Sequence, residues 1–259
     1  MVKANKHQAK IYASITLLIL LGLWWLVTSF GWIKDFFLPS PLQVLIAAKD
    51  LFVINNFSKD IGISIFRILI GFLVAILAGL PVGFFLGLNK RFSLSVEPVI
   101  DFIRYTPIPA FIPLFILWLG IGELEKIVVI AVSVFFQFAL MVANSVSSVP
   151  LKLIKSGKTL GANRWQIIIK VIFPFAKPRI FDDLRISMGW AWSGLMLAEL
   201  VGSTSGIGFV IIQSQRLLQT ANVIAAIIIV GMLGLLTDFI FNKLYIKYFP
   251  WAPKTDHHA

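Results

Sequence analysis

The sequence predicts an all-α integral membrane protein with six transmembrane helices. Of its 259 residues, 58% are hydrophobic and only 14% are charged, which leaves too few polar side chains to cover a water-soluble globule. Long uncharged segments recur along the chain, and lysine and arginine gather in alternate loops. These three observations indicate that most of the surface faces lipid.

The residue types also exclude several kinds of chemistry. The chain has no cysteine, so it has no disulfides, thiolate metal sites or cysteine nucleophiles. Its three histidines, His7, His257 and His258, lie in the terminal tails. We therefore expect neither a metal site nor an intramembrane enzyme.

Six segments are long and apolar enough to be spans, since a helix needs about 20 apolar residues to cross the hydrocarbon core. The first is too long for a signal-peptide core and lacks a small-x-small cleavage site, so we expect it to remain as an anchor. The third contains Asp101, Arg104 and three prolines, but is still expected to cross as one span. The predicted spans are 11–30, 68–88, 98–120, 127–149, 186–201 and 223–241.

The distribution of basic residues predicts the orientation, because basic loops stay in the cytoplasm. Sixteen of the 23 lysine and arginine residues fall in the N-terminal tail, the second and fourth loops and the C-terminal tail. Both termini are therefore expected on the cytoplasmic side of the membrane. The net charge of +11 follows mainly from this topology, so it does not indicate a nucleic-acid partner.

The fourth loop is the most informative segment. Residues 151–160 are expected to form a helix that ends at Gly161, and Asn163 to cap a second helix over 164–173. Pro174 lacks a backbone donor and should end or turn that helix. The resulting hairpin, within 151–175, is either a docking element or a basic loop lying against anionic lipid headgroups.

The spacing in this loop resembles a motif of the membrane subunits of ABC importers: Glu-Ala-Ala, three residues, Gly, nine residues, Ile-x-Leu-Pro. Gly161 and Pro174 have the required spacing, with Val171 and Phe173 in the Ile and Leu positions. The chain departs from the motif at its start, where Lys155, Ser156 and Gly157 replace Glu-Ala-Ala. The salt contact of the family's glutamate is therefore not expected here.

Other segments resemble the sulfonate, taurine, nitrate and bicarbonate branch of these permeases. They are Leu160-Gly161-Ala162-Asn163-Arg164-Trp165, Gly189-Trp190-Ala191-Trp192, Ala198-Glu199-Leu200, Ser205-Gly206-Ile207-Gly208 and Arg104-Tyr105-Thr106-Pro107. The resemblance implies a type I importer (MetI-like) permease fold. Residues 61–245 would be the permease domain, 1–60 the tail, first helix and external loop, and 246–259 a cytoplasmic tail.

The resemblance also implies partners and a mechanism. Two permease chains, expected as a homodimer in membrane lipid, would form the pathway for a small anion. Two cytoplasmic ATP-binding subunits, carrying ATP and Mg²⁺, would drive them between inward and outward states, and an extracytoplasmic binding protein would deliver the substrate. The expected ATPase-coupling residues are Lys155, Ser156, Gly157, Leu160, Gly161, Ala162, Arg164, Trp165, Val171, Phe173 and Pro174.

The chain itself is not expected to hydrolyse ATP or to bind a cofactor. Gly157-Lys158-Thr159 imitates the end of a phosphate-binding loop, but Lys152 stands where that loop needs its first glycine. An ATP-independent carrier or channel is the alternative function. It would leave the basic hairpin unexplained, and no internal repeat typical of carriers is found.

Five residues are expected along the translocation pathway: Arg104, Pro107, Trp192, Glu199 and Arg216. Charges inside a membrane are costly and often functional. Glu199 is either a gate residue or a structural carboxylate held by a base in the third span. Arg104 should pair with Asp101, three residues earlier, and Arg216 meets either a solute anion or a headgroup.

Glycines recur at close spacing in two of the predicted spans. Gly79, Gly83 and Gly87 are spaced four apart, which lets another helix approach closely. Gly231 and Gly234 in the last span are expected to do the same. We expect packing roles for them, since glycine offers no side chain to recognise a solute.

Overall fold

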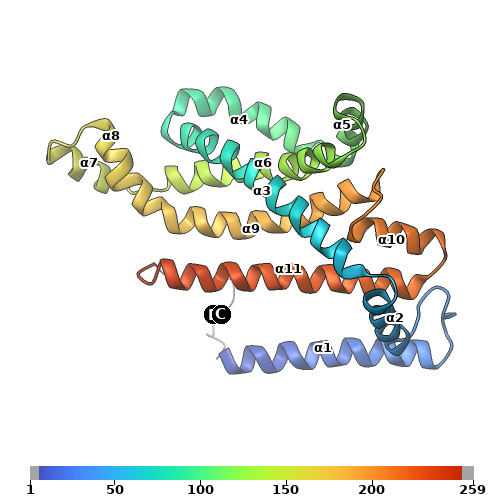
Figure 1. The fold of residues 1–259 in the computed structure, drawn as a ribbon. Coiled ribbons are helices and arrows are strands. Elements are labelled where there is room, and N and C mark those ends of the chain that lie inside the picture. Colours follow the sequence, from blue (N-terminus) through green and yellow to red (C-terminus); the bar gives the residue numbers. More distant parts are fainter. Residues whose placement is uncertain (1–5, 253–259) are drawn as a thin grey trace.

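The computed structural model describes residues 6–252, with the side chains of residues 6, 7, 9 and 10 left aside. This part of the chain is helical and contains no strand (Figure 1). The predictions for His7, His257 and His258 lie outside the described part. The helices are α1 (Lys6–Ser29), α2 (Pro41–Val53), α3 (Phe57–Leu88), α4 (Lys90–Tyr105), α5 (Ile112–Leu119), α6 (Glu123–Ser147), α7 (Leu151–Thr159), α8 (Arg164–Ile167), α9 (Phe173–Leu200), α10 (Ile207–Arg216) and α11 (Thr220–Tyr248).

The core is built where α6 packs between α3 and α9. Four glycines of α3, Gly71, Gly79, Gly83 and Gly87, face α6, and a Cβ added at Gly83 would lie 2.5 Å from the carbonyl oxygen of Ala139. Gly79 and Gly87 meet α6 in the same way, so the predicted packing role of the three glycines is confirmed.

The glycines of the last span behave differently. Nothing lies within 4 Å of a Cβ built on Gly231 or Gly234. The close helix packing predicted for them is therefore wrong for the single chain.

Four helices are long and apolar enough to cross a membrane: α1, α3, α6 and α11. A fifth candidate is the pair formed by α4 and Ile108–Leu119, which is bent by 90°. The remaining predicted span, 186–201, is the fifth in chain order and corresponds to the second half of α9. That helix has 28 residues, but the charges in its first half keep it from meeting the same criterion of composition.

The bend corrects the prediction of one continuous span over 98–120. Thr106 leaves the helix with φ −77° and ψ 127°, since the residue before a proline is pushed out of the α region. A 3-10 turn, Ile108–Phe111, then leads into α5. Pro107, Pro109 and Pro113 remove the donors that a continuous helix would need.

Two short helices at the far end from the hairpin were not expected from the sequence. α2 begins with a capping box, in which Ser40 Oγ accepts from the Gln43 N–H and Gln43 Oε1 accepts from the Ser40 N–H, and Pro41 occupies its first position. α10 joins α9 to α11.

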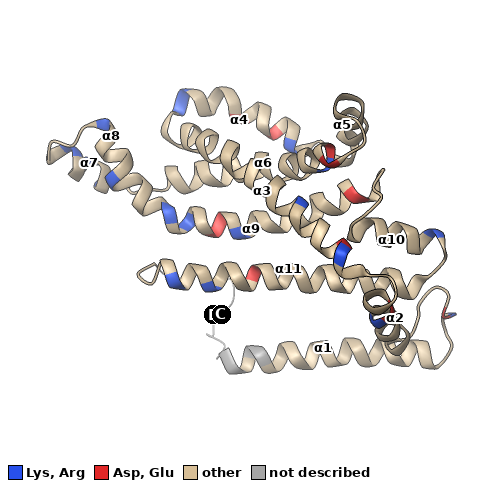
Figure 2. Cartoon of the chain, in the orientation of Figure 1, with Lys and Arg blue, Asp and Glu red and all other residues tan. Residues whose placement is uncertain are grey.

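The two ends of the bundle differ in charge. The start of α1, the end of α11 and the α7–α8 hairpin lie at the same end (Figure 1). Lysine and arginine gather at this end, as Figure 2 shows. The basic segments that predicted the orientation from the sequence therefore also lie together in space.

The close approach of α3 and α6 can be tested with a pair of glycines on the same helix. We expect Gly83→Val to destabilise the protein by about 1–3 kcal/mol, since the added side chain overlaps the backbone of α6. Gly62→Val is the matched control, because nothing lies within 4 Å of a Cβ at Gly62. Thermal unfolding in detergent measures both, and an equal shift of the two melting temperatures would contradict the assignment.

Candidate functional site

The predicted hairpin is present, and its turn is specified by local interactions. α7 ends at Thr159, and Gly161 follows with φ +79°, in the left-handed region that favours glycine. Asn163 Oδ1 accepts from the Gln166 N–H at 2.8 Å, and Gln166 Oε1 accepts from the Asn163 N–H at 2.9 Å. This capping box starts α8 as predicted.

The second arm does not end at Pro174, which corrects the prediction. α8 passes through a π-helical turn, Ile168–Ile172, into α9, and Pro174 lies in the first turn of α9. The Phe173 N–H donates to the carbonyl of Ile168, five residues earlier. Proline is tolerated in the first turn of a helix, and the wider π turn before it lets the chain continue past Pro174 without a break. The hairpin is therefore continuous with α9.

The hairpin exposes a row of apolar side chains. Leu160 is 86% exposed, Trp165 72% and Ile169 61%. Their neighbours Ile167 and Ile172 are buried, so the element has one face toward the bundle and one face without cover. An uncovered apolar face rimmed by charge is typical of a protein-binding surface.

The remaining predicted coupling residues are distributed between the two faces. Lys155, Ser156, Gly161, Arg164, Phe173 and Pro174 are exposed, whereas Gly157, Ala162 and Val171 are half-buried. Gly157 lies near Ile167 and Val171, and the ring of Phe173 lies 5.9 Å from that of Phe84. Thus some of these residues attach the hairpin to the bundle and others face outward.

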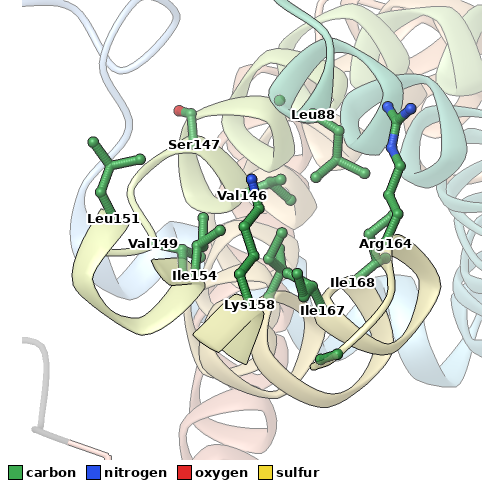
Figure 3. A pocket seen from close by; sticks show the side chains of 13 residues that line it. Leu88, Val146, Ser147, Val149, Leu151, Ile154, Lys158, Arg164, Ile167 and Ile168 are labelled. Carbon is green, nitrogen blue, oxygen red and sulfur yellow. The ribbon is translucent and has the colours of Figure 1, made fainter. Parts of the chain in front are cut away.

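A cavity of about 660 Å³ separates the hairpin from the ends of α3 and α6. Leu88, Val146 and Ile167 contribute apolar side chains to its wall. The long side chains of Lys158 and Arg164 rise from the hairpin along the cavity (Figure 3). The hairpin therefore packs on the bundle through its apolar side chains and leaves a cavity beside Lys158 and Arg164.

At the opposite end, Arg67 and Glu199 form a buried ion pair. Each residue is 1% exposed, and Arg67 Nη1 lies 2.8 Å from Glu199 Oε1. The sequence placed the partner of Glu199 in the third span, but the partner comes from α3, the second. Arg67 Nε also donates to Glu123 Oε2 at 2.7 Å.

The loop between α9 and α10 closes around this pair. Arg67 Nη1 donates to the Ser205 carbonyl at 2.8 Å. Ser64 Oγ and the Gly208 N–H donate to the Glu199 carboxylate at 2.7 and 2.8 Å. Both charges are therefore fully hydrogen-bonded, as ions buried in a membrane protein must be.

The other predicted pathway residues do not meet at one place in the single chain. Arg104 Nη2 lies 2.8 Å from Asp101, which confirms that pair. Trp192 is buried, and its Nε1 donates to Thr237 Oγ1 of α11 at 3.2 Å. Pro107 and Arg216 are exposed, at the break after α4 and at the end of α10.

Arg67, Ser64 and Glu123 were not expected from the sequence to belong to a buried cluster. Arg67 directly precedes the second predicted span, and its other partner, Glu123, lies 56 residues away. The one available signal was the unbalanced carboxylate of Glu199, since a buried charge requires a partner. Among the described residues, no group of three acidic or histidine side chains is arranged to hold a metal ion.

Comparisons with known proteins define the class of this chain. The model of the family described as binding-protein-dependent transport system inner membrane component matches residues 71–246. The chain belongs to this family. It is therefore the inner-membrane permease component of an ABC importer, distinct from the ATP-binding subunits and the substrate-binding protein with which such a component works.

Several curated relatives are similar over most of their length. The putative aliphatic sulfonates transport permease protein SsuC of Bacillus subtilis is 36% identical over 90% of this chain and 84% of its own. The taurine transport system permease protein TauC of Escherichia coli is 35% identical over 91% and 88%. The nitrate import permease protein NrtB of Synechocystis is 30% identical over 78% and 76%.

A solved structure shares the fold. The inward-facing MetNI methionine ABC transporter matches with a TM-score of 0.66 and 21% identity, over 73% of this chain and 94% of that chain. The MetI-like fold inferred from the sequence is thereby confirmed.

The buried pair is expected to be essential for folding. Arg67→Ala leaves the Glu199 carboxylate buried without its cation, and we expect a loss of about 3–5 kcal/mol. Arg104→Ala removes a partly exposed pair and should cost no more than about 1 kcal/mol. The yield of monodisperse protein and its thermal unfolding in detergent measure both losses, and the account fails if the two variants are equally stable.

Proposed function

We propose that two copies of this chain form the membrane pathway of an ATP-driven importer for a small oxyanion. The α7–α8 hairpin is the handle through which two cytoplasmic ATP-binding subunits move that pathway. ATP and Mg²⁺ bind to those subunits, and this chain, which lacks a complete phosphate-binding loop, hydrolyses nothing itself. The conversion between inward- and outward-facing states follows closure of the ATP-binding subunits.

The observation that carries this proposal is an exposed apolar hairpin that is continuous with a long membrane helix. The uncovered side chains of Leu160, Trp165 and Ile169 supply contact area, and aromatic side chains are often the anchors of protein interfaces. The unbroken path from α8 into α9 makes the hairpin a lever rather than a free loop. A loop that only touched lipid headgroups would not need this continuity.

The substrate class is inferred from the relatives. Their names specify aliphatic sulfonates, taurine and nitrate, and the sequence resemblance adds bicarbonate. These solutes all present a small anionic group with two or three equivalent oxygens. We therefore propose a small oxyanion, with most of the selectivity set by the extracytoplasmic binding protein.

The proposed orientation places both termini and the hairpin in the cytoplasm. It is supported by the concentration of lysine and arginine at that end of the bundle (Figure 2). The opposite end, where α2, α10 and the loop between α9 and α10 lie (Figure 1), would then face the binding protein. The apolar outer faces of the spans would contact membrane lipid.

Docking of the hairpin can be tested with two equally exposed tryptophans at the same end of the molecule. Trp165 and Trp251 are both 72% exposed, so replacing either one should leave the fold intact. We expect Trp165→Ala to weaken binding of the ATP-binding subunit by about 30-fold, as for an interface anchor, and Trp251→Ala to leave binding unchanged. Titration of the purified permease in nanodiscs with the ATP-binding subunit measures both. Equal affinities for the two variants would refute docking through Trp165.

The geometry of the turn can be tested at Gly161. Its φ of +79° is disfavoured for a β-branched residue by about 1–2 kcal/mol, so Gly161→Val should distort the hairpin and reduce ATP-driven uptake. Gly161→Asn is the control, because asparagine tolerates this conformation. Membrane insertion should be unchanged in both. Normal uptake by Gly161→Val would show that coupling does not require this turn.

A further inference from the structure

Arg104 lies beside the middle of α6, one of the helices long and apolar enough to cross a membrane. Its Nη1 donates to Gln137 Oε1 at 3.3 Å. Gln137 is about 21 Å along α6 from Glu123 and about 15 Å from Ser147, at 1.5 Å per residue. A charge at this depth is too costly to face lipid and is found beside a protein interior or a water-filled cavity.

The face of α6 beside Arg104 carries polar side chains. Ser133, Gln137 and Asn144 recur at spacings of four and seven residues, which places them on one side of the helix. The Ser133 hydroxyl donates to the Val129 carbonyl at 2.7 Å and lies against Gly194 of α9, so the amides of Gln137 and Asn144 are the groups open to water. Asn144 is exposed, and Ser133 and Gln137 are half-buried. Such a stripe, in the apolar part of a membrane helix, is unsuited to lipid and suited to water.

The guanidinium of Arg104 retains capacity for a further acceptor. It donates to Asp101, Gln137 and, at 3.5 Å, to the hydroxyl of Tyr105, which account for at most three of its five N–H donors. The side chains of Arg104 and Asp101 are 33% and 44% exposed. Arg67, by contrast, is completely enclosed, so its donors are not accessible to a solute.

We propose that Arg104, assisted by Gln137, is the oxyanion-recognising group of the translocation pathway. This inference rests on the proposed function and adds the substrate contact to it. The planar fork of arginine matches two oxygens of a sulfonate or nitrate group. Asp101 competes with the solute for the same donors and so keeps the anion from being held too tightly to leave.

The pathway then has a defined order of elements. α4 ends just before the break at Pro107, so Arg104 lies in its last turn, beside α6. From there the polar stripe of α6 leads through Asn144 toward the end that carries the hairpin. A second copy of the chain would present a second Arg104 to the same pathway.

The test uses the complete transporter in proteoliposomes, with the permease, its ATP-binding subunit and the binding protein. Uptake of radiolabelled taurine, an alkanesulfonate and nitrate is measured, together with ATP hydrolysis stimulated by the loaded binding protein. For the probe that wild type accumulates, we expect Arg104→Gln to reduce uptake by about ten-fold or more, since a hydrogen bond to a charged group is lost. Stimulated ATP hydrolysis should stay close to wild type, and Arg104→Lys should restore part of the uptake.

Two controls separate recognition from a structural role. Lys243→Gln removes one exposed base from α11 and should leave uptake unchanged. The exchange Asp101→Arg with Arg104→Asp keeps an ion pair but moves the guanidinium about one helical turn from Gln137, so uptake should remain low. If the exchanged protein transports normally, or if Arg104→Gln alone does, the inference is wrong.

Failure of the proposed function gives a different result. If wild type accumulates none of the three probes in the presence of ATP, the proposed function fails before Arg104 is tested. If wild type accumulates a probe and Arg104→Gln loses stimulated ATP hydrolysis together with uptake, Arg104 acts in the conformational change and the recognition role is overturned.

Discussion

The pairing of Arg67 with Glu199 fixes the end of α9 that lies farthest from the hairpin. Both side chains are 1% exposed, and separating them would leave an unpaired ion in a medium of low dielectric constant. From this anchor α9 runs for 28 residues, about 42 Å, to the π turn that carries the hairpin. A displacement of the hairpin is therefore passed along one helix to the loop around Ser205 at the other end.

The close contact between α3 and α6 makes α3, α6 and α9 one tightly packed unit. Gly71, Gly79, Gly83 and Gly87 allow the two helices to touch through backbone and Cβ atoms, so they cannot slide without a clash. α1 lies outside this packed unit, because only 6% of its apolar stretch is buried. It is attached through Trp24, whose Nε1 donates to the Pro39 carbonyl at 3.0 Å.

Local signals in the sequence were sufficient where one segment determines its own structure. Gly161 and Asn163 have conformations set by backbone sterics and capping, and both were predicted. Pro174 was misjudged because its effect depends on the π turn before it, which no short-range rule specifies. The partner of Glu199 could not be predicted, since Arg67 is brought to it by the packing of α3 on α6 and α9. Gly231 and Gly234 have the spacing of a packing face, but spacing does not show which faces a single chain leaves open.

In the proposed mechanism, the pathway moves solute only when an ATP-hydrolysing partner pulls on the hairpin. The direct measurement is flux of a small oxyanion into proteoliposomes that contain the purified chain alone, compared with liposomes that contain the complete transporter. We expect the chain alone to give no flux down a concentration gradient, and the complete transporter to accumulate the anion against one when ATP is supplied. Downhill flux through the chain alone, at a rate like that of the complete transporter, would identify a carrier or channel and contradict the account.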